Sequence, residues 1–220
     1  MPDTEPKHQR LSDMISDALG EPDRDLANQT FENAEQLGKD ILVADPQDAN
    51  ACYAIALTWY HRWGSSAERH NCIDWLRKTE AIDPEHPWVP LYLGYQYFDE
   101  GQFQVAFKEF NRVNREFFES IGQHWRNLKT DELALVCRIR GDFDPPTIAS
   151  LRQLVSIYIA ASEEDRAVPV EIVCALNDPQ LRQRFDTSPC DVAREGIRLI
   201  EGTGEQRVFS GELLQLRSAT

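Results

Sequence analysis

The same Asp-Pro turn pattern occurs twice in this sequence, 38 residues apart, and it restricts the possible folds more than any other feature. The stretch "VADPQDANACYAIALTWY" can be laid over "AIDPEHPWVPLYLGYQYF" so that Asp45-Pro46 matches Asp83-Pro84. Proline cannot continue a helix, and it disfavours helical geometry at the residue before it. Each pair therefore predicts the end of one helix and the turn that leads into the next. A period in the thirties, built as helix, turn and helix, is typical of an α-solenoid.

Apolar residues recur at helical spacing on both sides of these turns. We expect a helix over 25–44, followed by helices over 49–63 and 67–82 that are joined by a glycine-serine turn. A second pair is expected over 87–101 and 102–118. The two helices of this pair are expected to be joined by a turn at Gly101, because glycine adopts unusual backbone angles at little steric cost. A further helix is expected over 147–165, and one more over 191–202. Residues 168–178 are long enough for a helix but rich in valine, so a strand remains the alternative for this segment.

The pattern divides the chain into three parts. Residues 1–24 are acidic and contain three prolines, which predicts a loosely structured arm with at most a short amphipathic helix over 10–19. Residues 25–140 are expected to form the helical repeats. Residues 141–220 are expected to form a helical extension that caps the apolar flank of the last repeat. The predicted fold class is all-α, an α-α superhelix of helix-turn-helix hairpins with a helical C-terminal extension.

One set of positions has the residue types and the spacing of a known helical repeat: Leu93, Gly94, Tyr97, Gly101, Ala106 and Phe110. On these positions, residues 28–117 resemble a tetratricopeptide repeat (TPR) protein, with about two and a half degenerate repeats. One unit earlier the fit is looser, at Tyr53, Ala56, Tyr60, Leu76 and Pro84, and Leu57 stands where a small residue is expected. Small residues at the crossing of two helices allow their close approach, and large rings then fill the space on either side.

The resemblance implies that the first helix of each hairpin lines a concave groove. The candidates for this groove are Ile55, Thr58, His61, Arg62, Trp88, Tyr92, Tyr95 and Asp99. Some TPR proteins bind acidic peptide tails with lysines, arginines and asparagines, and alanine, threonine, leucine and tyrosine stand at those positions here. An apolar and aromatic wall instead suits an extended or helical hydrophobic peptide. It would equally suit the protein's own C-terminal helices, and the sequence leaves both open.

Charge and cysteine usage restrict the class of function. The net charge of −14 argues against a nucleic-acid partner, which would require phosphate neutralisation. Residues 1–50 carry 12 acidic against 4 basic side chains, which indicates a solvated arm or, as the alternative, a dock for basic partners. No window approaches 18 apolar residues and the N-terminus lacks a signal-peptide pattern, so we expect no membrane partner. Five cysteines without a CxxC pair favour a reducing, cytoplasmic environment.

Patterns that carry chemistry are weak in this sequence. His61, His70, His86 and Cys72 do not complete a zinc-ligand spacing, so neither a metal nor another cofactor is expected. The sequence contains neither a GxSxG elbow nor a lysine-bearing phosphate loop, so we expect no catalytic residues and no enzyme. Arginine stands beside tryptophan at 62–63 and 125–126, either as an interface anchor or as hairpin packing.

These patterns predict a non-catalytic protein-protein interaction module, an adaptor or scaffold that binds a protein or peptide partner in the groove. Homo-oligomerisation through the same surface is a close variant. The alternative is a small-molecule-binding or catalytic role in a pocket between the solenoid and the C-terminal half.

Overall fold

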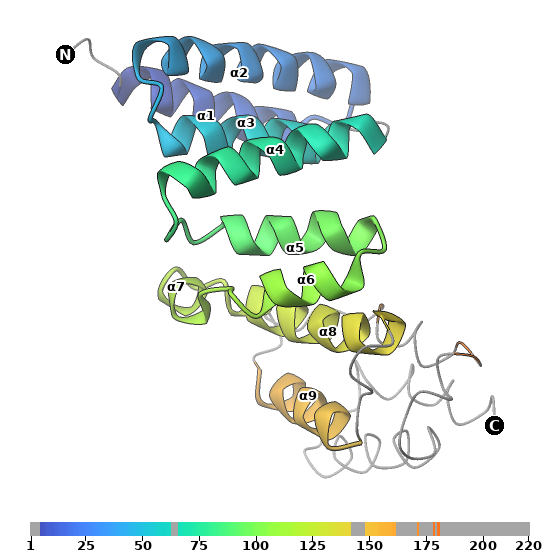
Figure 1. Ribbon diagram of the computed structural model, residues 1–220. Coiled ribbons are helices and arrows are strands. Elements are labelled where there is room, and N and C mark those ends of the chain that lie inside the picture. The colour runs from blue at the N-terminus through green and yellow to red at the C-terminus, as the bar shows by residue number, and fades with distance from the viewer. Residues whose placement is uncertain are drawn as a thin grey trace. The chain divides into compact units, whose positions relative to one another are not determined.

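The computed structural model of the protein describes residues 5–62, 66–141 and 148–161, together with Glu171, Asp178 and Gln180. Within these residues every regular element is a helix, and no strand occurs (Figure 1). The chain divides into two compact units, Met1–Gln96 and Tyr97–Thr220, each with its own internal packing. The predicted all-α fold class is confirmed.

The first unit consists of helices that pack in chain order. They are α1 (Glu5–Gly20), α2 (Arg24–Ala44), α3 (Ala49–His61), α4 (Ser66–Ile82) and the part of α5 (Val89–Asp99) up to Gln96. α1 packs on α2, α2 on α3 and α3 on α4, and α1 also reaches α3. The short turns before α2 and α3 return each of these helices alongside its predecessor, as expected for stacked helical hairpins (Figure 1).

Helix α1 corrects a prediction, because the expectation of a loosely structured arm is wrong for residues 5–20. Leu11, Ile15 and Ala18 recur at helical spacing and are buried in one core with residues of α2 and α3. Nε2 of His8 lies 2.8 Å from Oδ2 of Asp48, just before α3. A helix of 16 residues is only marginally stable in isolation, and burial against its neighbours supplies the stability. α1 is thus the first half of a hairpin with α2.

The two Asp-Pro turns have the same hydrogen bonding. The backbone N–H groups of Asp45 and Asp83 each donate to the carbonyl four residues earlier and so close the preceding helix. Each carboxylate accepts a hydrogen bond from the backbone N–H two residues later, from Gln47 at 3.1 Å and from Glu85 at 3.2 Å. Side-chain bonds of this kind stabilise turns. The pattern read from the sequence is therefore a structural repeat as well.

Burial along α3 and α5 follows the same offset of 38 residues. The buried residues of α3 are Ala51, Cys52, Ile55, Ala56 and Thr58, and their counterparts Val89, Pro90, Leu93, Gly94 and Gln96 are buried too. Gly94 is thus matched by Ala56 and not by Leu57. The apparent departure from the repeat pattern at Leu57 disappears in this register, because a small buried residue stands at the same place in both helices.

The tightest approach between α2 and α3 occurs at Gly38, which the repeat pattern does not single out. A Cβ atom added at this position would lie 2.6 Å from Cγ1 of Ile55 and 3.1 Å from its Cδ1. Both residues are buried. Because protein interiors are close-packed, the crossing has no room for even one more methyl group.

The second unit is organised around α8 (His124–Gly141). Its other helices are the end of α5, α6 (Phe103–Phe110), α7 (Arg115–Ser120) and α9 (Ile148–Ala160). α6, α7 and α9 all pack on α8. Phe110, Phe118 and Ile139 are among the largest fully buried side chains of this unit.

The turns of the second unit confirm one prediction and correct another. Gly101 has a φ of 72°, the left-handed conformation expected at the hinge. The single helix expected over 102–118 is wrong, because the chain leaves helical geometry at 111–114. Asn114 begins a new helix there, and its Oδ1 accepts a hydrogen bond from the N–H of Phe117 at 3.0 Å. The helix expected over 147–165 is observed over 148–160 as α9, and residues 162–165 lie outside the described residues. So do the element expected over 168–178, apart from Glu171 and Asp178, and the one expected over 191–202.

Candidate functional site

Aromatic rings gather in the first unit between α3 and the first part of α5. Two of the contributing segments are these helices, and the third is the turn that precedes α5. The rings, which we call the ring cluster, belong to Tyr53, Tyr60, His61, His86, Trp88, Tyr92 and Tyr95. Every member lies within 6.4 Å of another, measured between ring centroids.

Helical spacing explains why these rings meet. Tyr53 and Tyr60 are seven residues apart, which places them two turns apart on one face of α3. Trp88, Tyr92 and Tyr95 follow one another at intervals of four and three residues, on one face of α5 and just before it. The ring of Tyr92 joins the two stripes, with its centroid 6.0 Å from that of Tyr53 and 4.8 Å from that of Tyr60.

These rings contact one another directly. Tyr60 meets Tyr92 edge to face, and the ring of Tyr92 lies at 87° to that of Tyr95, 6.0 Å away. Distances of about 4.5–7 Å between centroids are those of packed aromatic pairs. An aromatic cage for a cation would hold its rings around an opening instead. The cluster is therefore a continuous packed surface.

The cluster has a buried base and a more accessible rim. Tyr92 is 7% exposed and His86 is 6% exposed, whereas the other five rings are half-buried. Tyrosine and tryptophan combine an apolar ring with a polar atom, which is why they are enriched in protein interfaces. The rim is thus suited to contact with another molecule.

Four of the eight predicted groove residues lie together in this cluster: His61, Trp88, Tyr92 and Tyr95. Tyr53, Tyr60 and His86 were not among the predicted residues. The spacing of seven residues between Tyr53 and Tyr60 was the signal that could have revealed their common face. Asp99 is exposed at the end of α5, and it belongs to the second unit.

The groove prediction is wrong for two residues, because both are buried. Ile55 and Thr58 are both 0% exposed. The side chain of Ile55 packs at the Gly38 crossing, and Oγ1 of Thr58 donates a hydrogen bond to the carbonyl oxygen of Ile55 at 2.7 Å. These positions of α3 face the neighbouring helices of the core, so neither side chain is available to a partner.

The prediction that Arg62 lies in the groove and contacts a partner is also wrong. Its side chain is 8% exposed, and Nη2 lies 2.7 Å from Oε2 of Glu35 in α2. Its Cζ atom lies 4.4 Å from the ring centroid of Trp59, and Lys39 also binds Glu35, at 2.6 Å. Arg62 thus connects the end of α3 to α2 and compensates a buried carboxylate.

His86 acts as an aromatic ring rather than as a charged group. Burial lowers its pKa, while the neighbouring carboxylate of Asp83 acts in the opposite direction. Nδ1 of His86 is buried and has no hydrogen-bond partner among the described residues. Its ring centroid lies 4.6 Å from that of Tyr53. A neutral imidazole in this position extends the ring cluster.

The three thiols that the structure describes are buried and protonated. Cys52, Cys72 and Cys137 are free and buried. Burial raises the pKa of Cys72 and that of Cys137 to about 12, which leaves almost no thiolate at neutral pH. In the part of the chain that the structure describes, no three His, Cys, Asp or Glu side chains gather as they would around a metal ion.

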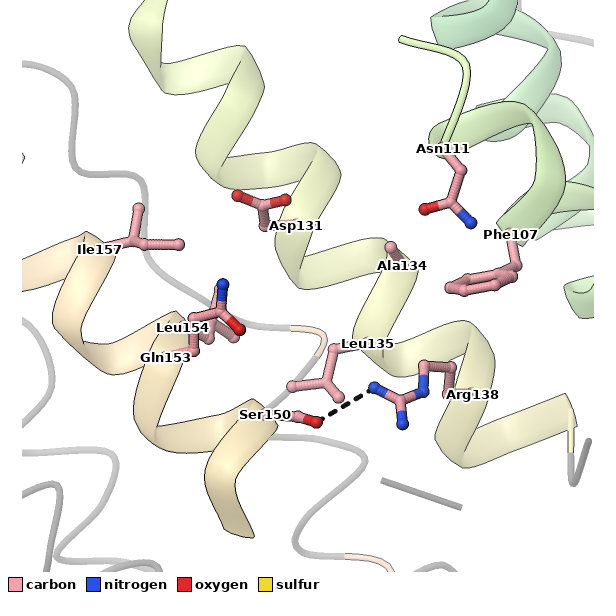
Figure 2. A pocket seen from close by; sticks show the side chains of 10 residues that line it. All are labelled: Phe107, Asn111, Asp131, Ala134, Leu135, Arg138, Ser150, Gln153, Leu154 and Ile157. Carbon is pink, nitrogen blue, oxygen red and sulfur yellow. Dashed lines mark hydrogen bonds between the residues drawn. The ribbon is translucent and has the colours of Figure 1, made fainter. Parts of the chain in front are cut away.

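A pocket of about 280 Å³ lies in the second unit, between α6, α8 and α9 (Figure 2). Its apolar lining consists of Phe107, Ala134, Leu135, Leu154 and Ile157, and its polar lining of Asn111, Asp131, Arg138, Ser150 and Gln153. α9 opens the part of the chain predicted as the C-terminal extension. The pocket therefore lies in the region where the alternative prediction expects one.

The two charged groups of this pocket differ in their partners. Oδ1 of Asp131 lies 2.7 Å from Nη2 of Arg115, a residue outside the lining. Burial raises the pKa of Asp131, and the Arg115 guanidinium acts in the opposite direction. Nη1 of Arg138 donates a hydrogen bond to Oγ of Ser150 at 3.1 Å, from α8 to α9 (Figure 2).

No protein-family model matches this sequence, and a search of curated proteins found no significant match. Among the helices of the described residues, none combines the length and the apolar character that a membrane span requires. Function is therefore inferred from the ring cluster and the pocket themselves.

Proposed function

We propose that this protein is a TPR-like helical repeat protein that serves as a non-catalytic interaction module, an adaptor or scaffold, and that the ring cluster holds its partner. The observation that carries the proposal is the cluster itself, in which five of seven packed rings remain half-buried. Tyrosine and tryptophan dominate the binding energy of many interfaces. They supply large contact area with few rotatable bonds.

The proposed partner is an extended peptide segment of another protein, with apolar side chains. From Trp88 to Tyr95 the stripe advances seven residues, about 10 Å at the rise of a helix. An extended chain covers that length with about three residues. The rings would bury the apolar side chains of such a segment, and tyrosine hydroxyls at the rim would hydrogen-bond to its backbone.

Two features support a protein partner in a reducing cytoplasm. The described cysteines are free thiols, as expected where disulfides do not persist. The net charge of −14 disfavours a role that depends on binding phosphates.

The test is affinity capture from the native cell lysate, followed by calorimetric titration of the captured partner's segment. Trp88→Ala and Tyr95→Ala remove half-buried rim rings and leave Tyr92 and His86, the buried base of the cluster, in place. Each is expected to weaken binding by about 2 kcal/mol, roughly 30-fold, as for interface hot spots. Tyr95→Phe should retain most of the affinity, because the ring remains.

Trp125→Ala is the matched control, since Trp125 is 37% exposed and lies in the second unit. Undiminished capture by both rim variants, with circular dichroism unchanged, would contradict the proposal. A loss of capture with Trp125→Ala alone would assign the binding surface to the second unit. Sedimentation velocity on the wild type and on Trp88→Ala identifies the case in which the partner is a second copy of the chain.

A further inference from the structure

We propose that the pocket between α6, α8 and α9 binds a small organic carboxylate with an apolar body, and that Arg138 holds the carboxylate group. All ten lining residues belong to the second unit. The inference is therefore independent of the ring cluster, and either proposal can fail without the other.

The size of the pocket limits the ligand. Its volume of about 280 Å³ is near the lower end of the range for small-molecule sites, about 300–1,000 Å³. The same volume of liquid water would contain about nine molecules, at about 30 Å³ each. A ligand the size of a short aryl or alkyl acid fits this space, whereas a nucleotide or a folded peptide does not.

The apolar walls come from all three helices. Phe107 of α6 presents its ring toward α8, and Leu135 of α8 lies opposite Leu154 of α9 (Figure 2). Leu135 and Leu154 are 6% and 3% exposed, so these walls belong to the packed core. A ligand placed between them would exchange water for apolar contact, which favours a hydrocarbon or aryl body.

One end of the pocket is suited to a carboxylate. Arg138 and Ser150 face each other there, and their hydrogen bond fixes the position of the guanidinium (Figure 2). An arginine carries five N–H donors in a planar fork, so it can bind a carboxylate while it keeps its bond to the serine.

Asp131 does not turn the pocket into a site for cations. Its carboxylate forms an ion pair of 2.7 Å with Arg115, which compensates its charge. It also stands seven residues before Arg138, about 10 Å away along α8. Asn111 and Gln153 are exposed amides and add no charge. Pairing with Arg115 thus leaves no uncompensated negative charge at the Asp131 end of the pocket.

The experiment uses the full chain and three probes of graded size: hexanoate, phenylacetate and 3-phenylpropionate. Binding is measured by calorimetry and by saturation-transfer NMR. At least one acid is expected to bind saturably. 3-Phenylpropylamine and 3-phenylpropionamide, which keep the body and change the charge, are expected to bind at least tenfold more weakly than 3-phenylpropionate. Absence of saturable binding by all three acids, or equal binding of the amine, would overturn the proposal.

Two pairs of variants locate the site. Arg138→Gln should weaken binding of the best acid about tenfold or more, since a hydrogen bond to a charged group is lost. Arg140→Gln makes the same charge change on the same helix outside the lining, and it should leave binding within about twofold. Equal effects of the two variants would show that only net charge matters and would refute the site.

A variant that fills the pocket keeps the test decisive if Arg138→Gln does not fold. Ala134 is half-buried in the lining, and Ala134→Phe places a ring in the space that the ligand would occupy. Binding should then be abolished. Ala149→Phe is the matched control, at an exposed position of α9 outside the lining. Acid binding that survives Ala134→Phe would exclude this pocket as the site.

Discussion

Two places where helices meet in this protein use space in opposite ways. At the α2–α3 crossing, the small residue Gly38 faces the branched side chain of Ile55, and no room for a methyl group remains. Between α8 and α9, the small residues Ala134 and Ser150 both line a pocket, which retains about 280 Å³. A small residue allows close approach only when its neighbour fills the space. Where small residues line both helices, a cavity can remain.

The two regions also differ in their relation to the repeat. The crossing in the first unit lies among helices whose turns and burial recur after 38 residues. The pocket is bounded by α9, which follows the part of the chain where that pattern is visible. Repeated packing is thus associated with a filled core, and a cavity is found where the repeat has ended. The following changes test this contrast.

The largest effect is expected from Ile55→Ala. Removing a fully buried branched side chain from the filled crossing should lower the free energy of unfolding by about 2–5 kcal/mol. Urea denaturation followed by circular dichroism measures the change. A loss below about 0.5 kcal/mol, as is usual for a surface residue, would mean that the side chain of Ile55 is not buried in the core. The α2–α3 crossing would then not be a filled contact, and the two regions would no longer differ.

Gly38→Ala should destabilise the protein by about 1 kcal/mol. Overpacking typically costs about 1–3 kcal/mol, and the helix preference of alanine over glycine offsets about 1 kcal/mol of it. In an Ile55→Ala background the same change should be neutral or stabilising, because the obstructing Cγ1 atom is gone. Gly20→Ala is the control, since a Cβ there meets no atom within 4 Å. Additive effects at positions 38 and 55 would mean that the crossing is not tightly packed.

Ala134→Leu should have the opposite sign to Gly38→Ala. The added carbons enter the pocket, and burial of apolar groups at about 0.8 kcal/mol per CH₂ should stabilise the second unit by up to about 1 kcal/mol. The urea midpoint reports the change. A destabilisation comparable to that of Gly38→Ala would show that the pocket is closed in solution.

The smallest expected effect is a pH dependence at the base of the ring cluster. The pKa of His86 in the folded protein is below the ordinary value of 6.5, so the unfolded chain binds more protons as the pH falls. The contribution of His86 to stability is complete above pH 6.5 and is lost as the pH falls toward the folded pKa. His86→Gln should therefore reduce the change in stability between pH 7.5 and 5.5 by up to about 1 kcal/mol.

For this pH test, denaturation curves at a series of pH values supply the measurement. His70→Gln is the control, because His70 is exposed on α4. The same loss of pH dependence in both variants would mean that the environment of His86 is not special. An unchanged slope in His86→Gln would indicate that the imidazole is solvated.

The sequence by itself determined helices α2 to α5, their approximate ends and the repeat of the Asp-Pro turns. Asp45-Pro46, Asp83-Pro84 and Gly101 act on the backbone within a few residues, so their effects can be read locally. Where local signals were absent or misleading, the predictions of α1 and α7 were wrong. Asn114 caps α7 within a stretch, 102–118, that contains neither glycine nor proline and so gave no sign of a break. α1 was missed because the prolines and acidic residues of 1–24 indicated a loosely structured arm.

Only the tertiary structure decided which faces of those helices meet. Tyr53 and Tyr60 lie on the opposite face of α3 from Ile55 and Thr58, and the sequence alone did not show which of the two faces enters the core. For this reason Ile55 and Thr58 were assigned to the wrong side, and Tyr53 and Tyr60 were overlooked. Arg62 is held inside by Glu35, which lies 27 residues away in the sequence. The pocket depends on the volume that three separate helices leave unfilled, and no local pattern encodes that volume.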